Sequence, residues 1–168
     1  GSEMCIRDRF DGCRALTTIT LGEGITEIGK EAFAYSGVEE LRFGDGLKSI
    51  GYRAFDGCDD LIYIELGAGL ESIGMEAFRS CNSLKSIIIP ASVRFIGAKA
   101  FNIKISVNIF YEGSKADLGE VSKGINWMNN APIYYYTETE PPKNGSGTGY
   151  DDYYWRYASD NATPVIWQ

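Results

Sequence analysis

Apolar and polar residues alternate over short stretches of this chain, and the stretches return at a nearly constant interval. In the first of them, Leu16, Ile19 and Leu21 are separated by polar residues, so their side chains face one way and the intervening ones the other. The interval is marked by a series of phenylalanines: Phe10, Phe33, Phe55, Phe78 and Phe101. The pattern predicts short β-strands that recur about every 22 or 23 residues.

Four copies of this unit align when each is started at its phenylalanine. After the strand comes a glycine-rich turn, G-x-G in three copies and Pro90-Ala91-Ser92 in the last, and then an Ile-Gly pair. The stretch that leads through the next phenylalanine suits one short helical turn. A single copy cannot bury its apolar side chains, whereas stacked copies share a continuous core. The repeat therefore predicts a solenoid whose parallel strands lie about 4.8 Å apart.

The repeated form AF-x-G-C-x-x-L-x-x-I-x-L-(P/G)-x-x-(V/I)-x-x-I-G resembles the BspA-like leucine-rich repeat. That family is found mainly in surface and secreted proteins of gut and oral bacteria, and in some protists. The resemblance covers about residues 10–113. It implies a β-rich leucine-rich-repeat solenoid, right-handed and about four and a half coils long. Its parallel strands should occur about once per coil and be joined by short helical turns.

Residues 114–168 resemble the element that often ends such arrays. We expect them to form a small antiparallel β appendage that caps the last coil, with a hairpin around residues 159–162. The Gly/Ser/Asn-rich stretch 141–152 predicts a loop inside this appendage.

The first nine residues, GSEMCIRDR, stand outside the repeat, which begins abruptly at Phe10. Codons reading GGC TCG GAG ATG TGT ATA AGA GAC AG would encode most of this stretch, and that string resembles the transposase mosaic end of sequencing-library adapters. We interpret residues 1–9 as translated adapter fused to a truncated reading frame, the alternatives being a natural tail or a cloning scar. On this interpretation Cys5 carries no functional role.

Composition narrows the possible functions. The formal net charge of −7 argues against nucleic acid as a partner, because phosphate backbones require a basic surface. No apolar run approaches the roughly 18 residues of a membrane-spanning helix. The sequence contains no histidine, which is the commonest general base and metal ligand. We therefore expect no cofactor, no metal site, no catalytic residue and no enzymatic activity.

The cysteines after residue 9 are expected to be structural. Cys13, Cys58 and Cys81 occupy one repeat column, in which the second copy has Ser36. A small inward-facing residue explains this column, since free cysteine is among the most buried residue types. Stacked side chains point the same way, which disfavours a disulfide between neighbouring coils. Zinc would need histidine or paired C-x-x-C spacing, and the sequence has neither.

Other motifs have similarly plain explanations. The recurrent G-x-G lacks the third glycine and the following long helix of a dinucleotide-binding loop, so it indicates a corner that every coil must turn. Adjacent acidic pairs predict solvated surface rather than the two separated carboxylates of a glycosidase. These pairs are Glu39-Glu40, Asp59-Asp60 and Asp151-Asp152.

The outward positions of the strands form the first candidate binding surface. Two rows should run across the coils, and Arg42 and Glu65 should be neighbours within one of them. The rows are Thr18, Glu40, Tyr63, Ser86 and Thr20, Arg42, Glu65, Ile88. In leucine-rich repeats this is the usual ligand face. The alternative is that any sheet has an outer face and that these residues have no role in binding.

The aromatic C-terminal region forms the second candidate surface. Seven tyrosines and three tryptophans lie between residues 127 and 168, and exposed rings can stack on sugars or on partner proteins. The residues proposed for this surface are Tyr153, Tyr154, Trp155 and Tyr157. The alternative, which we favour, is that a small appendage uses large rings to pack on the last coil.

The resemblance to the BspA-like family implies a non-enzymatic adhesion or binding module, and the exposed strand face is physically suitable for engaging a protein, matrix or glycan partner. A carbohydrate-binding appendage and a structural spacer in a larger surface protein are the alternatives. We expect an extracellular or cell-surface location, with the signal peptide lost together with a missing N-terminus. The uncapped first coil exposes apolar edge surface and also predicts self-association.

Overall fold

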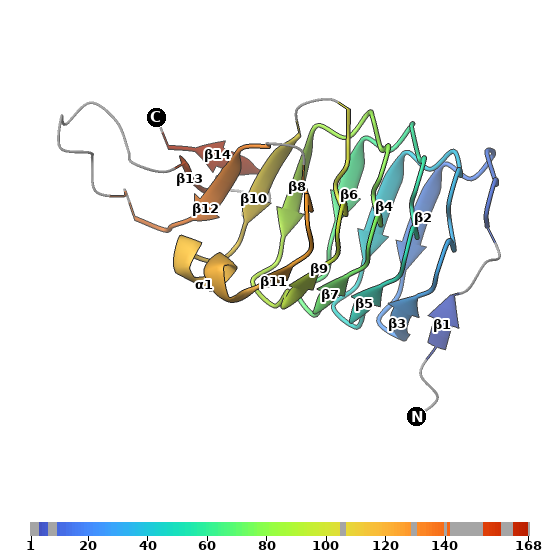
Figure 1. The fold of residues 1–168 in the computed structure, drawn as a ribbon, viewed down its shortest axis with the longest axis horizontal. Helices are drawn as coiled ribbons and strands as arrows, with labels where there is room; N and C mark the ends of the chain where they lie inside the picture. Colours follow the sequence, from blue (N-terminus) through green and yellow to red (C-terminus); the bar gives the residue numbers. More distant parts are fainter. Residues whose placement is uncertain are drawn as a thin grey trace.

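Stacked coils form a solenoid of parallel strands, and further strands close its C-terminal end (Figure 1). The structure is a computed structural model and describes residues 4–6, 10–104, 107–128, 131–139, 141, 153–158 and 163–167. The only helix among these residues is α1 (Lys115–Glu120), which begins with a capping box between Ser114 and Asp117. The predicted solenoid is confirmed.

Each coil contributes two strands, not the single strand expected. The outward-facing rows predicted from the sequence lie on the sheet of β2 (Thr18–Leu21), β4 (Glu40–Phe43) and β6 (Tyr63–Glu65). The Ile-Gly pairs form a second parallel sheet along another side of the solenoid. Its strands are β1 (Met4–Ile6), β3 (Ile25–Ile28), β5 (Ser49–Ile50), β7 (Ser72–Ile73), β9 (Phe95–Ile96) and β11 (Ser122–Lys123).

Glycine after each isoleucine makes the second sheet possible. The N–H of Gly51 donates to the oxygen of Ile28 at 2.7 Å, and Gly74 repeats this bond to Ile50 at 2.8 Å. A Cβ atom at Gly51 would lie 2.7 Å from the carbonyl carbon of Gly29 in the neighbouring coil. Only glycine lets the backbones approach this closely, so the Ile-Gly pair is a strand that the residue pattern alone did not reveal.

The segments through the phenylalanines are single hydrogen-bonded turns, as expected, and none of the described ones continues into a helix. Each contains a residue of positive φ at the same repeat position, namely Glu31 (53°), Arg53 (52°), Glu76 (57°) and Lys99 (55°). A left-handed residue cannot continue a right-handed helix. The backbone groups bond instead to the next coil, as when the N–H of Phe33 donates to the oxygen of Ala54 at 2.9 Å.

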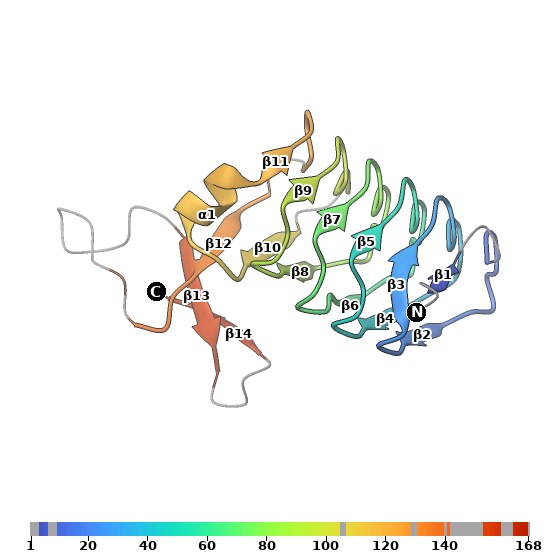
Figure 2. The same cartoon turned by 90° about the horizontal axis from the view of Figure 1, so that it is seen from below.

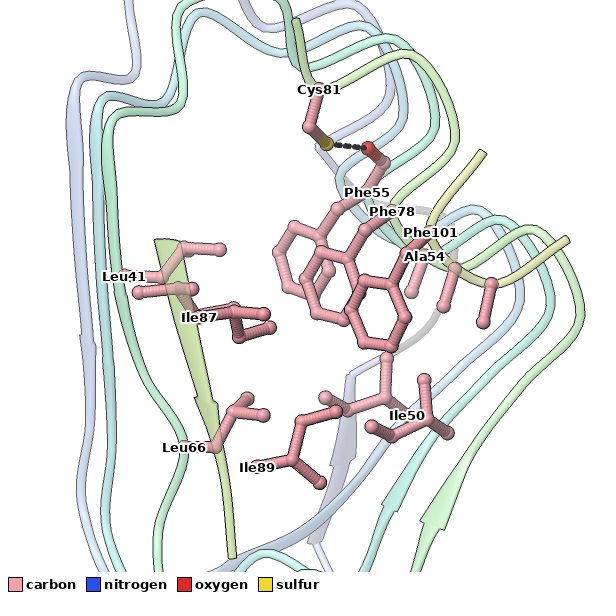
Figure 3. Packing of buried hydrophobic residues seen from close by; sticks show 14 of the residues in the cluster. Leu41, Ile50, Ala54, Phe55, Leu66, Phe78, Cys81, Ile87, Ile89 and Phe101 are labelled. Carbon is pink, nitrogen blue, oxygen red and sulfur yellow. Dashed lines mark hydrogen bonds between the residues drawn. The ribbon is translucent and has the colours of Figure 1, made fainter. Parts of the chain in front are cut away.

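A column of phenylalanine rings runs through the core of the solenoid (Figure 3). Neighbouring rings are nearly parallel, with centroids 5.1 Å apart for Phe10 and Phe33 and 5.5 Å apart for Phe78 and Phe101. The alternating apolar residues of the strands pack against this column from the opposite side, as Leu41 does. These are the positions that the sequence pattern assigned to the core.

The described cysteines are free thiols with a structural role, as expected. Cys58 donates to the oxygen of Phe33 and Cys81 to the oxygen of Phe55, each at 3.2 Å (Figure 3 shows the second bond). Burial raises the pKa of Cys58 to about 11 and that of Cys81 well above its ordinary value. Both thiols therefore stay protonated, and each donates its hydrogen bond to a backbone carbonyl of the preceding coil.

The C-terminal strands form a mixed sheet, which corrects the expected antiparallel appendage. This sheet starts inside the solenoid, and β8, β10, β12 and β13 are all parallel; only β14 runs antiparallel, to β13. The strands are β8 (Ser86–Ile89), β10 (Asn108–Tyr111), β12 (Ile133–Tyr136), β13 (Tyr153–Tyr157) and β14 (Pro164–Ile166). The β13–β14 pair confirms the predicted hairpin, whose tip at 159–162 lies outside the described residues.

Backbone pairing with the solenoid continues beyond residue 113, and the predicted boundary between repeats and appendage stays a prediction. Strand β11 still pairs with β9 of the solenoid, and Gly124 donates to the oxygen of Ile96 at 2.8 Å, which continues the column of Ile-Gly bonds. Helix α1 is inserted within this last coil (Figure 2). Of residues 1–9 only 4–6 are described, as strand β1 beside β3. The adapter origin of this segment stays a prediction, and residues 142–152 of the predicted loop lie outside the described residues.

The aromatic rings of the appendage cover the outward face of the solenoid at β10. Phe110 points outward in register with Ile88, yet it is only 4% exposed. It packs against Tyr134 and Trp155, with ring centroids 5.1 and 5.3 Å away. Trp155 is fully buried, and its Nε1 donates to the oxygen of Tyr111 at 3.0 Å. The outward strand face therefore ends at the appendage.

Candidate functional site

The two predicted rows of outward side chains are present on β2, β4 and β6. Strand pairing places Glu40 between Thr18 and Tyr63, and Arg42 between Thr20 and Glu65. Most of these side chains are exposed, while Glu40 is half-buried. The first part of the candidate surface thus has the register expected from the repeat.

The rows are interrupted before Ser86 and Ile88, because β8 belongs to a different sheet from β6. In two other coils the residue after the strand extends the ladder, since Gly44 donates to the oxygen of Leu21 and Glu112 to that of Ile89. Pro90 occupies this place after β8 and has no N–H to donate. Ser86 and Ile88 still follow Tyr63 and Glu65 along the solenoid, as Figure 1 shows for β8 and β6, but without a shared ladder.

A cleft of about 320 Å³ opens where the ladder is interrupted. Strands β6 and β8 line it with four of the predicted side chains: Tyr63, Glu65, Ser86 and Ile88. Its other side comes from the appendage, at Tyr157 and Pro164. Figure 2 shows β13 and β14 turning away from the direction of β10 and β12. The two candidate surfaces, predicted separately, therefore meet in one cleft.

Two carboxylates that line the cleft were missed by the sequence analysis. Asp45 follows β4 and accepts a hydrogen bond from the N–H of Ala68 at 2.7 Å. Glu112 follows β10 and accepts one from the hydroxyl of Tyr157. Burial and this contact with Glu112 raise the pKa of Tyr157 well above its usual range. Their positions, one residue or two beyond a strand, are the only signal in the sequence that could have indicated them.

Arg42 lies beside the cleft and holds the exposed groups of the strand face together. Its guanidinium is 3.1 Å from Glu65, 3.6 Å from Glu40 and 4.8 Å from the centre of the Tyr63 ring. The predicted Arg42–Glu65 pair is therefore confirmed. Because the two side chains are 48% and 54% exposed, the pair contributes only about 0.2–1 kcal/mol to stability. Its significance is that it orients a tyrosine ring and a carboxylate at the mouth of the cleft.

The second candidate surface is only partly available to a ligand. Trp155 is 0% exposed, so its inclusion in an aromatic binding surface was wrong. Tyr154 is half-buried and Tyr157 faces the cleft, while the side chain of Tyr153 lies outside the described part of the structure. Trp155 instead packs on β10 of the last coil, which agrees with the alternative favoured from the sequence, that the rings of the appendage serve packing.

A separate cluster of charged residues lies at the turns that carry Arg53 and Glu76. Arg53 donates to Glu76 at 2.6 Å and Arg79 donates to it at 3.1 Å, while Asp56, only 1% exposed, lies 3.4 Å from Arg79. Burial raises the pKa of Asp56 despite both arginines. Each charge faces an opposite charge on its own coil or on an adjacent one, which is the arrangement of a structural cluster joining coils.

None of the described residues form a group of three or more histidine, cysteine, aspartate or glutamate side chains arranged to hold a metal ion. Nor does any helix in the described ranges have the length and apolar character needed to cross a membrane.

A profile of the BspA type leucine rich repeat region matches residues 6–120 in six copies. The chain belongs to this family. The match includes the coils that build β6 and β8, so the cleft is formed partly by BspA-type repeats and partly by the strands that follow them. No curated protein sequence matches the chain significantly.

Solved structures of bacterial leucine-rich repeat proteins share the fold of this BspA-type chain. A leucine rich cell surface protein from Faecalibacterium prausnitzii is 24% identical, with a TM-score of 0.51 over 62% of this chain and 34% of its own. A leucine-rich repeat protein from Bacteroides ovatus is 21% identical, with a TM-score of 0.53 over 78% of this chain and 46% of its own. The BspA-type chain thus spans less than half the length of either protein.

Proposed function

We propose that this chain is a non-enzymatic binding module of a secreted or cell-surface bacterial protein. It engages a protein or matrix partner through the outward face of β2, β4, β6 and β8. The observation that carries this proposal is the register of the two outward rows, which end in a cleft closed by the appendage. A binding surface with a recessed end offers a partner both area and an anchoring point.

Two further observations support the proposal. The chain belongs to the BspA-type leucine-rich repeat family, and a structural neighbour is described as a cell surface protein. The side chains of this face contribute little to the stability of the fold, because they are exposed while their neighbours along the strands form the core. The exposed residues are Thr18, Thr20, Arg42, Tyr63 and Glu65. Substitutions on this face can therefore change binding with little effect on folding.

The test compares paired variants of the purified chain for binding to immobilised extracellular-matrix proteins and to intact epithelial cells. Arg42→Ala and Tyr63→Ala remove two side chains of the strand face. Their matched controls lie on the other sheet or directly before one of its strands. Lys48→Ala, just before β5, removes an exposed cation paired with Glu71 at 3.6 Å, and Phe95→Ala on β9 removes a ring that is 45% exposed, against 43% for Tyr63.

We expect the strand-face variants to weaken binding about tenfold or more while the controls bind like the unchanged chain. Equal losses from both pairs, or binding that no surface variant affects, would contradict the proposal. The second result would instead favour a spacer role. Protease treatment of intact cells that produce the protein tests its location, since a surface protein is cleaved without lysis.

A further inference from the structure

The cleft between the strand face and the appendage has a chemical character that goes beyond a general binding face. We propose that it receives a lysine or arginine side chain of the protein partner. This inference rests on the proposed function and specifies which part of a partner enters the cleft. Four features of the site support it.

The first feature is the charge of the lining. Asp45, Glu65 and Glu112 line the cleft, and no lysine or arginine is among the described residues that line it. Asp45 and Glu112 accept hydrogen bonds from neutral donors, a backbone N–H and a tyrosine hydroxyl. Neither forms an ion pair with a described residue. These contacts orient the two carboxylates without compensating their charge, so a cation entering the cleft gains attraction from both.

The second feature is a guanidinium already bound at the edge of this cleft. Arg42 packs over the Tyr63 ring at 4.8 Å and donates to Glu65 at 3.1 Å. A tyrosine face together with a carboxylate is therefore an arrangement that holds an arginine here. Tyr157 and Glu112, joined by their hydrogen bond on the other side of the cleft, repeat the same pair of groups.

The third feature is the apolar part of the lining. Ile88 and Pro164 are half-buried and line the cleft, whereas Ile64, Ile87 and Leu66 belong to the core behind it. Lysine and arginine have aliphatic stems that lie along such surface while the charged end reaches a carboxylate. A small hydrated cation would gain nothing from this surface, whereas a basic side chain uses both parts of the cleft.

The fourth feature is what the cleft disfavours. Its carboxylates repel phosphates and sulfated glycans. A neutral glycan needs an open aromatic face for stacking, but Arg42 lies over Tyr63 and Trp155 is buried. The observations therefore favour a peptide with a basic side chain over a sugar.

The experiment titrates the whole chain, labelled with nitrogen-15, with acetyl-Val-Arg-Val-Arg-amide, and follows amide chemical shifts. A second peptide replaces both arginines with citrulline, which keeps the shape and removes the charge. The cleft variants are Asp45→Asn and Glu112→Gln, since each amide oxygen can still accept the existing hydrogen bond. The matched control is Glu27→Gln, because Glu27 is an exposed carboxylate on β3 of the other sheet.

We expect the arginine peptide to shift the amides of β6, β8 and residue 112. Its affinity should exceed that of the citrulline peptide by about tenfold or more and should fall as salt is raised. Each cleft variant should lose about threefold to tenfold in affinity, and the control none.

Equal binding of the two peptides, shifts on another face, or equal losses in the control would overturn the inference. Maltohexaose serves as the glycan arm, and shifts of the same amides by maltohexaose but not by the arginine peptide would also overturn it. Failure here remains distinct from failure of the proposed function. If Asp45→Asn and Glu112→Gln leave matrix binding intact while Arg42→Ala and Tyr63→Ala abolish it, the strand face binds a partner that does not use the cleft.

Discussion

The phenylalanine column should make stability depend on position within the stack, and Phe78→Ala tests this dependence. Phe78 is 0% exposed, and its ring lies between those of Phe55 and Phe101, at 5.4 and 5.5 Å. Truncation of a buried phenylalanine costs about 3–5 kcal/mol, because apolar burial is lost and a cavity remains. Each aromatic pair adds about 0.5–1.5 kcal/mol beyond burial. Since two pairs are lost, we expect a value near the upper end, about 4–5 kcal/mol.

Phe10→Ala is the matched comparison, because it makes the same change at the end of the same column. Phe10 is 38% exposed and stacks on one described ring, that of Phe33 at 5.1 Å. Its removal opens no enclosed cavity, so we expect a loss of only about 1–2 kcal/mol. Phe78→Leu serves as a second control that keeps most of the apolar volume and should cost about 1–2 kcal/mol.

The assay is equilibrium unfolding in urea, followed by far-ultraviolet circular dichroism and by tryptophan fluorescence. Trp127 packs edge-on against Phe101 at 6.2 Å, so its fluorescence reports on the end of the stack. The free energy of unfolding should fall about 3 kcal/mol further for Phe78→Ala than for Phe10→Ala. Equal losses in the two variants would refute the reasoning, because they would mean that stacking between two neighbours adds nothing to the burial of one ring.

Three further predictions concern the charged cluster, the cysteines and the first coil. Burial by itself would raise the pKa of Glu76, but hydrogen bonds from Arg53 and Arg79 outweigh burial and leave the pKa below its ordinary value of 4.5. The stability that Glu76 contributes is therefore fully present above pH 4.5 and is lost as the pH falls through the pKa of the folded state. Glu76→Gln should cost about 1–3 kcal/mol at pH 7 and progressively less in acid, as measured by urea unfolding at several pH values, and a cost independent of pH would contradict this assignment. Iodoacetamide should label the half-buried Cys13 before Cys58 and Cys81, which should react only on unfolding, and mass spectrometry of the peptides reads the order. Strand β2 forms the edge of its sheet, so the chain should self-associate as its concentration rises, and Thr20→Lys should reduce this in size-exclusion chromatography with light scattering.

The sequence could predict the features that depend on the repeat. A period of two within the strand and of about 22 or 23 between strands determines which residues become neighbours. The rows through Glu40 and Arg42, and the burial of Cys58 and Cys81, follow from that register alone. The turns were harder, because Glu31 and its equivalents adopt positive φ without being glycine or asparagine. Tertiary hydrogen bonds between coils stabilise that backbone, and such bonds leave no local signal.

The cleft could not be predicted because it arises where the repeat fails. Pro90 has no N–H, so it cannot donate the bond that Gly44 makes to Leu21 and Glu112 makes to Ile89, and β6 and β8 lie in different sheets. From the sequence alone, this proline is another way to make the turn, which is correct locally and overlooks the neighbouring coil. The far side of the cleft depends on Tyr157 and Pro164, whose path back to the solenoid is set by the packing of Trp155 on β10. A residue that departs from the repeat consensus can therefore change a solenoid by removing a hydrogen bond to the adjacent coil. In this chain that missing bond coincides with the cleft where the strand face meets the appendage.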